Sequence, residues 1–380
     1  MLIKKPPYKG ASKSKEKKVS EEKKEKSPTS DLIFTGNIYI FHAFDVGNEI
    51  DLEKVKESQE LILQTLQIPK YFKNYHAPLA IDLPHPHTTS SCISCKIHNF
   101  GPISLTYKIP FKSSLNDIRM QLQDLENEYQ EESVVNARSV YNKIKNHVEG
   151  GKFFQTRSSY VLVQVDQQPE NITVDQLKKQ HGGVIASMLR FETETLSEYQ
   201  KNEILQDAIG YFRGEMIVPD TEAAFVYDNE YEEILDLFEF SNIQRLQLRY
   251  FDRLLDRQLN LIYEEKLGKI PLTYYLPFFR APWRGPISDL GKLRVDISVI
   301  SERLENSIKL AGEAYYSELY ELLIDKLDLK NWKDSIDKKL DIVGEIRSVY
   351  QHKIDAIRED LLTMLIIILI FIELVIGLLK

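Results

Sequence analysis

Cysteine is scarce in this sequence, which contains two cysteines among 380 residues. Two thiols cannot build the disulfide framework on which small secreted proteins depend, so that class of protein is excluded. The chain also lacks the G-x-x-x-x-G-K-[ST] phosphate loop and the motifs G-x-G-x-x-G, H-E-x-x-H and G-x-S-x-G. Without these signatures we expect a protein that is not an enzyme and that needs no cofactor.

Apolar residues make up 43% of the chain and charged residues 28%, a composition that supports a hydrophobic core and excludes a fully disordered protein. The net charge of −8 is unevenly divided, because residues 1–30 contain ten lysines and four glutamates. Lysine, glutamate, serine and proline without an apolar run predict a disordered, Lys-rich arm over residues 1–30, rather than a signal or transit peptide. Because the remainder is acidic, nucleic acid is not favoured as a partner.

The longest apolar run lies at residues 361–379, LLTMLIIILIFIELVIGLL, where Thr363 and Glu373 are the two polar side chains. As a helix this run would be about 28 Å long, close to the ~30 Å hydrocarbon core of a bilayer. A buried core helix is the alternative, but a helix at the surface of a soluble core usually keeps a polar face. We therefore predict a transmembrane tail anchor over residues 361–379.

Charges on either side of this run predict its orientation. Arg347, Lys353 and Arg358 precede it, whereas Lys380 follows it. Positively charged flanks stay on the cytoplasmic side of a membrane, or on the equivalent matrix side of an organelle. We expect a single-pass membrane protein, with the lipid bilayer as a partner and the N-terminus on the cytoplasmic or matrix side.

Short β-branched and aromatic runs alternate with amphipathic segments over residues 31–228, which predicts an α+β domain. Residues 158–165 have the pattern of a strand, and residues 52–66 have that of a helix. Gly182 and Gly183 are expected to interrupt a further helix.

Helical patterns dominate residues 229–360, beginning with a long helix over residues 230–266 that contains neither glycine nor proline. Apolar residues then recur at steps of four and three from Ile336 to Leu361, broken only at Arg347. This spacing is typical of a coiled coil and predicts a stalk that leads into the membrane segment. The stalk could pair within one chain or between subunits, and we expect a homo-oligomer.

Three stretches of the C-terminal part resemble the required-for-meiotic-nuclear-division family, also called domain of unknown function 155. They are TEAAFVYDNEYEE at Thr221–Glu233, the segment from SVISERLENS to KIDAIRED at residues 298–360, and the terminal apolar run with Glu373. Members of that family are membrane-associated, and they include mitochondrial inner-membrane proteins linked to organelle translation. The resemblance implies an anchored scaffold rather than an enzyme.

The densest group of potential metal ligands lies in the segment HPHTTSSCISCKIH and consists of His85, His87, Cys92, Cys95 and His98. A C-x2-C pair with nearby histidines could supply four ligands to zinc. However, no second C-x2-C pair follows, and the alternation around Cys95 suits a strand in which this cysteine is buried. We favour the structural interpretation and keep a zinc site, and with it a zinc-dependent hydrolase, as an alternative.

Two further positions are candidate contact sites. Glu373 is an ionisable residue inside the predicted membrane segment, which indicates contact with a partner helix or a lipid head group unless the charge is tolerated near the helix end. Arg280 and Arg284 flank Trp283 in a proline-rich loop, a combination suited to stacking and phosphate binding. Packing of this loop onto the neighbouring helices is the alternative.

These patterns predict an α+β head domain, a long helical coiled-coil region and one C-terminal transmembrane helix. The function that fits this organisation is a tail-anchored membrane scaffold or tether, which self-associates and holds a protein partner that the sequence does not identify. A membrane-tethered factor that associates with RNA or ribosomes, through the Lys-rich arm and the Arg–Trp loop, is the alternative.

Overall fold

The computed structural model of the protein describes residues 32–66, 77–83, 91–153, 157–167, 172–264, 291, 294–295, 297–299 and 314–379. The chain divides into two units, residues 1–32 and residues 33–380, and the second unit contains all the helices and strands named here. The predicted Lys-rich arm over residues 1–30 lies outside the described residues.

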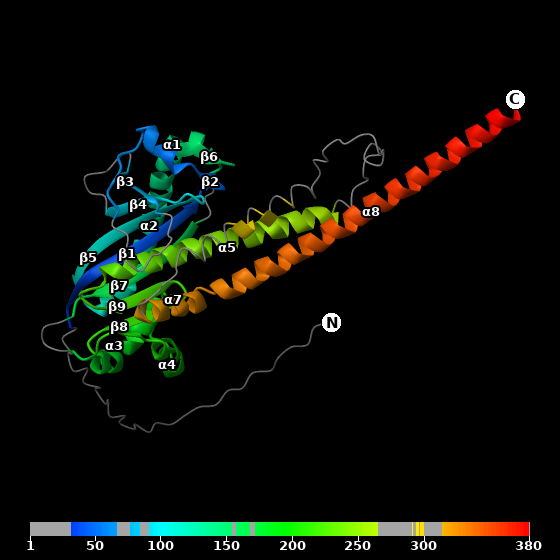
Figure 1. The fold of residues 1–380 in the computed structure, drawn as a ribbon. Coiled ribbons are helices and arrows are strands. Elements are labelled where there is room, and N and C mark those ends of the chain that lie inside the picture. The colour runs from blue at the N-terminus through cyan, green and yellow to red at the C-terminus, as the bar shows by residue number, and fades with distance from the viewer. Residues whose placement is uncertain are drawn as a thin grey trace, which may run out of the picture. The chain divides into compact units, whose positions relative to one another are not determined.

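Within the described ranges, seven strands form one mixed sheet in the order β3-β4-β5-β1-β7-β9-β8 (Figure 1). The strands are β1 (Phe34–Asp45), β3 (Leu79–Ile81), β4 (Cys92–Ile97), β5 (Pro102–Ser113), β7 (Arg157–Val165), β8 (Met216–Pro219) and β9 (Ala223–Tyr227). Neighbouring strands are antiparallel except β7 and β9, which are parallel. Parallel strands need a long crossover, and here helices α3 and α4 supply it.

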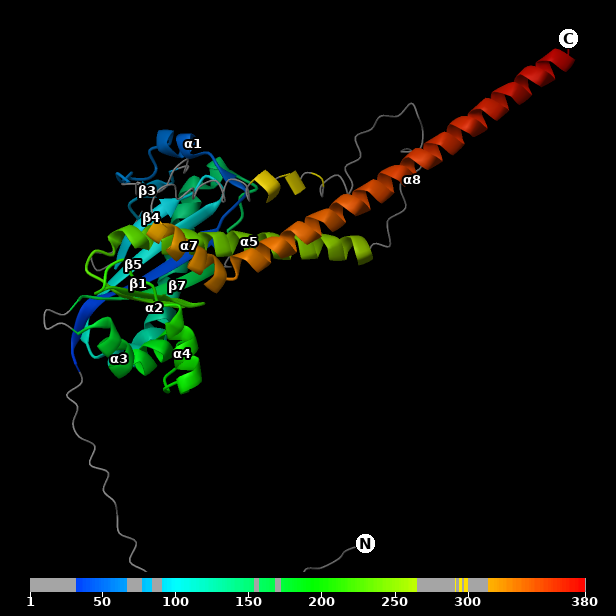
Figure 2. The same cartoon turned by 60° about the horizontal axis from the view of Figure 1, so that its bottom comes forward.

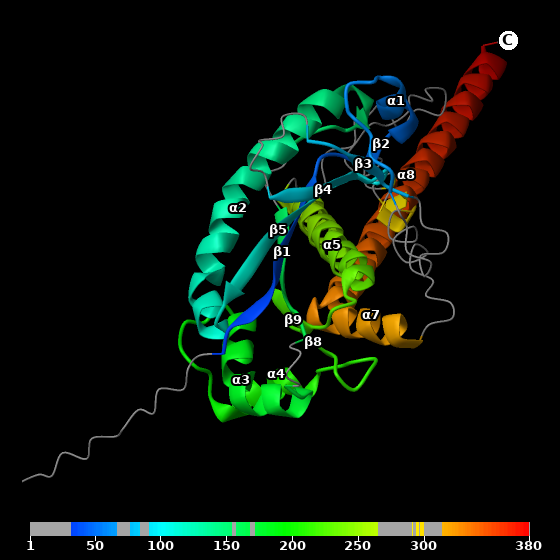
Figure 3. The same cartoon turned by 90° about the vertical axis from the view of Figure 1, so that its left-hand side faces the viewer.

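Both faces of the sheet are buried, which explains why its central strands are almost continuously apolar. Along β1, Ile38 and Ile40 contribute to a core on one face, whereas Tyr39 and Phe41 contribute to a second core on the other face. Figure 3 shows α2 (Leu115–Ile144) and α3 (Val174–Leu189) on the first face and α5 (Glu232–Glu264) on the second. The prediction of an α+β domain is confirmed in part, because the N-terminal region is a mixed α/β unit with a large sheet between helices.

Polar side chains at the N-caps begin the helices of the first face. Ser114, Thr173 and Ser197 each accept a hydrogen bond from a backbone N–H in the first turn of α2, α3 and α4 (Glu198–Gln206). The predicted interruption at Gly182 and Gly183 is wrong, because α3 continues through both glycines. A Cβ on Gly182 would lie 2.8 Å from Leu205 Cδ1, so the missing side chain lets α4 pack closely on α3.

The helix predicted over residues 52–66 is much shorter in the structure. Helix α1 (Leu52–Glu57) is capped by the Asp51 side chain and ends before Gln59, whose φ of 54° is incompatible with a continuing helix. The chain then turns extended, and Leu63 forms a β-bridge with Ile81 at the edge of the sheet. Pairing with the edge strand β3 therefore keeps the segment around Leu63 extended, although its local sequence pattern favours a helix. Two further short strands, β2 (Glu49–Ile50) and β6 (Val148–Glu149), pair with each other nearby.

Helix α5 lies against the sheet, and α7 (Ala314–Lys326) and α8 (Leu329–Leu378) pack beside it (Figure 2). Asp328, with a φ of 58°, reverses the chain between α7 and α8. The first third of α8 contributes Ile336, Leu340 and Val343 to the same core as α5. These are positions of the predicted coiled-coil seam, so its first part is used within one chain. No coiled coil is seen among the residues that the structure describes.

Candidate functional site

The most conspicuous surface of the described chain is the apolar end of α8. An 18-residue window of this helix has a mean hydropathy of 3.0, and none of that window is buried. Phe371, for example, is 66% exposed. Glu373 lies exposed within the same stretch, and the Thr363 hydroxyl donates to the backbone oxygen of Glu359 at 2.9 Å. By length and composition, α8 is the one helix in the described ranges that could cross a membrane.

The other end of α8 is held on α5 by apolar and charged contacts together. Lys339 Nζ lies 2.6 Å from Asp252 Oδ1 and 2.7 Å from Asp256 Oδ1, and Ser335 donates to Asp252 at 2.7 Å. Burial lowers the pKa of Lys339, but the hydrogen bonds to both aspartates outweigh it and hold the pKa above its usual value. The apolar end of α8 is thus continuous with a helix that is firmly attached to the α/β unit.

A buried ionic cluster joins α5 to the sheet. Lys96 Nζ on β4 lies 2.5 Å from Glu239 Oε2 and 2.8 Å from Asp236 Oδ1, and the Ser104 hydroxyl on β5 donates to Glu239 at 2.6 Å. Burial opposes the charge on Lys96, but Glu239 and Asp236 more than compensate and raise its pKa. Burial likewise opposes ionisation of Glu239, and Lys96 outweighs it and lowers the pKa of that carboxyl. Both groups are therefore charged inside the protein.

A second polar cluster lies on the same interface between sheet and helix. Ser158 on β7 donates to Asn242 Oδ1 at 2.7 Å and accepts from Arg245 Nε at 3.0 Å. Arg245 also donates to the backbone oxygen of Thr221 at 2.8 Å. The two clusters set the position of α5 along the sheet, because a shift by one helical turn would leave several buried polar groups unsatisfied. Neither cluster was predicted from the sequence. The one feature that could have indicated them is the presence of polar residues inside otherwise apolar strands.

Two of the predicted metal ligands lie on β4 and one follows it. Cys95 is buried, Cys92 is partly buried, and burial raises the pKa of Cys92 to about 12. His98 is buried, which lowers its pKa to about 4, and its Nε2 lies 3.4 Å from Ser104 Oγ. His85 and His87 lie outside the described residues. Where the structure can be described, no three His, Cys, Asp or Glu side chains are grouped to hold a metal ion.

A histidine–serine pair lies on the α2 face of the sheet. His42 Nδ1 is 2.8 Å from Ser159 Oγ, a distance that would suit a nucleophile and its base. However, burial, with a smaller contribution from Arg157, lowers the pKa of His42 to about 3, so the imidazole is a weak base. In the structure the pair forms a partly buried hydrogen bond between β1 and β7.

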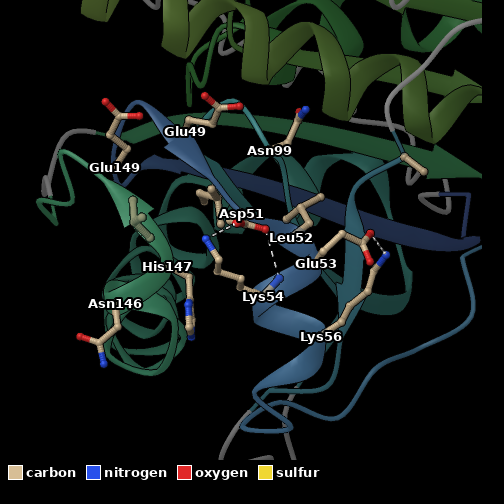
Figure 4. A pocket seen from close by; sticks show the side chains of 13 residues that line it. Glu49, Asp51, Leu52, Glu53, Lys54, Lys56, Asn99, Asn146, His147 and Glu149 are labelled. Atoms are coloured by element: carbon tan, nitrogen blue, oxygen red, sulfur yellow. Dashed lines mark hydrogen bonds and ion pairs between the residues drawn. The ribbon is translucent and has the colours of Figure 1, made fainter.

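A polar hollow of about 710 Å³ lies beside α1, β2 and β6. Figure 4 shows the side chains that line it. Lys54 lies 2.8 Å from Asp51 and Lys56 lies 2.7 Å from Glu53, so the charges along α1 neutralise one another. Ion pairs exposed in this way contribute little to stability. The predicted contact residues Arg280, Trp283 and Arg284 fall outside the described residues.

Comparison with known proteins corrects the family expected from the C-terminal stretches. A family model described as "Uncharacterized protein MJ0711, N-terminal domain" matches residues 35–233. This match covers the sheet and the helices of its first face, which is the N-terminal part of the chain, so the resemblance to the required-for-meiotic-nuclear-division family is wrong.

One curated relative supports the same assignment. The chain is 26% identical over 211 residues to Uncharacterized protein MJ0711 of Methanocaldococcus jannaschii, over 54% of this chain and 62% of the relative. The matched region thus spans less than two thirds of the relative's length. No solved structure matches the chain. The chain belongs to the family described as the N-terminal domain of uncharacterized protein MJ0711.

Proposed function

We propose that this protein is a membrane-anchored scaffold, in which α8 holds the α/β unit at a bilayer surface. The observation that carries the proposal is the continuity of α8: its first turns are packed on α5, and its last part is apolar and exposed on all sides. Large contiguous apolar patches that are exposed to solvent mark sites of protein interaction or membrane contact.

The energetics favour insertion of this segment. Fifteen of the 19 residues at 361–379 are Leu, Ile, Phe or Val. At about −0.5 kcal/mol each, they contribute roughly −7 kcal/mol to insertion. A charged Glu373 would cost about 2 to 3 kcal/mol near the bilayer centre, which is less than the apolar gain.

Between Val343 and Leu361, α8 would form a stalk about 27 Å long. Arg347, Lys353 and Arg358 lie on this stalk, and such charges favour the cytoplasmic or matrix side of a membrane. Val349 is 64% exposed on the same stretch, which offers an apolar contact to a second copy of the chain. Self-association through the stalk is therefore part of the proposal.

Membrane fractionation tests the anchor. The full chain should remain in the membrane pellet after extraction with alkaline carbonate, and the variant Ile368→Arg/Phe371→Arg should move to the soluble fraction, because two central arginines each oppose insertion by about 2.5 to 3.5 kcal/mol. The matched control, Lys338→Gln/Lys353→Gln, changes charge outside the apolar segment and should stay in the pellet. Recovery of the unmodified chain as a soluble particle without detergent would rule out the anchor.

An RNA- or ribosome-associated role at the membrane is the second candidate. The ten lysines of residues 1–30 favour it, and the excess of acidic residues in the remainder opposes it. Salt-dependent RNA binding that disappears when these lysines are replaced by glutamine would support this role over a purely protein-binding scaffold.

A further inference from the structure

A second hollow, of about 620 Å³, lies where the loop before β8 meets the start of α5 and the start of α7. Its lining combines two kinds of side chain, aromatic and acidic. Four are aromatic: Tyr211, Phe212, Tyr315 and Tyr316. Five are acidic: Glu215, Asp228, Glu230, Glu232 and Glu233. We refer to this hollow as the aromatic groove.

The aromatic side chains form a connected wall. Ring centroids are 4.7 Å apart for Tyr211 and Phe212, 5.1 Å for Tyr211 and Tyr315, and 5.4 Å for Tyr315 and Tyr316. Tyr211 and Phe212 are each 64% exposed despite these contacts. Edge-on and tilted ring contacts thus hold the wall in place, while much of the apolar surface of Tyr211 and Phe212 faces water. Such a surface is typical of a site that binds a partner.

The carboxylates make the groove electronegative. Burial raises the pKa of Asp228, and Glu215 and Glu232 raise it further. Burial also raises the pKa of Tyr315, again with added repulsion from Glu215 and Asp228. Two bonds within the groove come from neutral donors: the Tyr316 hydroxyl donates to Glu233, and the backbone N–H of Phe212 donates to Glu215. Among the residues that the structure describes, neither lysine nor arginine lines this hollow.

The chemistry of the lining selects among cations. A calcium or magnesium ion requires several convergent oxygen ligands and gains nothing from aromatic walls. The described residues also contain no group of acidic side chains arranged to hold a metal ion. A lysine or arginine side chain, in contrast, suits both parts of the lining. Its apolar stem and its cation can pack on the ring faces, and the cation can form an ion pair with the carboxylates.

We propose that the aromatic groove binds a Lys- or Arg-rich segment of a partner protein, with basic side chains between the tyrosine rings and the carboxylates of the rim. The volume accommodates more than one side chain, since ligand pockets of about 300 to 1,000 Å³ hold drug-sized molecules. For the scaffold proposed above, the groove specifies the chemistry of the protein partner, which is a basic segment. It does not depend on insertion of α8 into a membrane, so the two proposals can fail separately.

Peptide binding to the full chain in non-ionic detergent tests the groove. Fluorescein-labelled octalysine should bind saturably, as measured by fluorescence anisotropy, and more weakly at higher salt. The variant Glu215→Gln/Glu230→Gln/Glu232→Gln should weaken binding about tenfold or more, and so should Tyr211→Ala/Phe212→Ala, because both the ion pairs and the ring contacts are lost. Circular dichroism spectra and unfolding midpoints of both variants should match those of the unmodified protein, because the mutated side chains lie at the surface.

The matched control removes three exposed charges from α2, with Asp124→Asn/Glu128→Gln/Glu131→Gln. This control should change affinity less than twofold. An equal loss of affinity in the control would show that the peptide responds only to overall charge and would overturn the proposal. An unchanged affinity of the aromatic variant, absence of peptide binding, or displacement of the peptide by free spermidine at the peptide's own concentration would overturn it as well.

Discussion

Lys96 on β4 and Glu239 on α5 form a buried ion pair, with 2.5 Å between Nζ and Oε2. The two residues are 143 positions apart in the sequence. Glu239 lies beyond the region matched by the family model, whereas Lys96 lies inside it. The ion pair therefore connects the domain matched by the family model to α5, the helix that follows it.

Removing one member of this pair should destabilise the protein strongly. In Glu239→Leu, Lys96 keeps Asp236 at 2.8 Å but loses its most buried partner. We expect a loss of about 3 kcal/mol, measured as a shift of the urea unfolding midpoint. The double variant Lys96→Met/Glu239→Leu should recover part of this loss, since the buried Lys96–Glu239 pair is removed as a unit and only Asp236, whose side chain is 27% exposed, loses its partner. Equal stability of the single and double variants would contradict the ionic interpretation.

Asp45 should make the protein less stable as the pH rises. Burial raises the pKa of this carboxyl to about 7, although a hydrogen bond from the backbone N–H of Gly47 opposes the shift. Between pH 4 and pH 7 the folded state therefore holds a proton that the unfolded state has released, so stability falls across this window at up to about 1.4 kcal/mol per pH unit.

Asp45→Asn tests this pH dependence, because the amide oxygen can still accept from Gly47. The variant should be more stable than the unmodified protein at pH 8 and close to it at pH 4, as measured by thermal unfolding. A stabilisation that is the same at both pH values would show that ionisation of Asp45 is not responsible.

Gly36 on β1 should tolerate no side chain. A Cβ at this position would lie 2.0 Å from the backbone oxygen of Gln164 on the neighbouring strand β7. Gly36→Ala should therefore force the two strands apart and cost about 2 to 4 kcal/mol. Gly214→Ala is the control, because its nearest neighbour would be 3.5 Å away, and it should change the unfolding midpoint very little.

The contact between α8 and α5 should determine how rigidly the apolar helix is attached. Ile336 and Val343 are 2% and 1% exposed. In Ile336→Ala/Val343→Ala we expect amide hydrogen exchange in residues 329–345 to accelerate by about a hundredfold, while exchange in α2 stays unchanged. Val349→Ala, at an exposed position, should leave both rates as they are. Uniform acceleration throughout the protein would indicate global destabilisation instead of a loosened helix.

Features that depend on neighbouring residues were predictable from the sequence. Residues 158–165 have the pattern of a strand and form most of β7, and the apolar run of α8 is evident from its composition. The burial of Cys95 on a strand also follows from local alternation. Residues of the candidate sites were harder to find, because the aromatic groove joins positions from three separate segments between Tyr211 and Tyr316.

By itself, then, the sequence determined the regular segments, the acidic balance of the chain outside residues 1–30 and the presence of one apolar helix long enough to cross a membrane. Only the tertiary structure decided where α1 ends and that α3 continues through Gly182 and Gly183. It also decided that the first apolar residues of the α8 seam pack against α5 of the same chain. The reason is physical: each of these outcomes depends on burial against residues distant in sequence, and that burial contributes more free energy than local helix or strand preference.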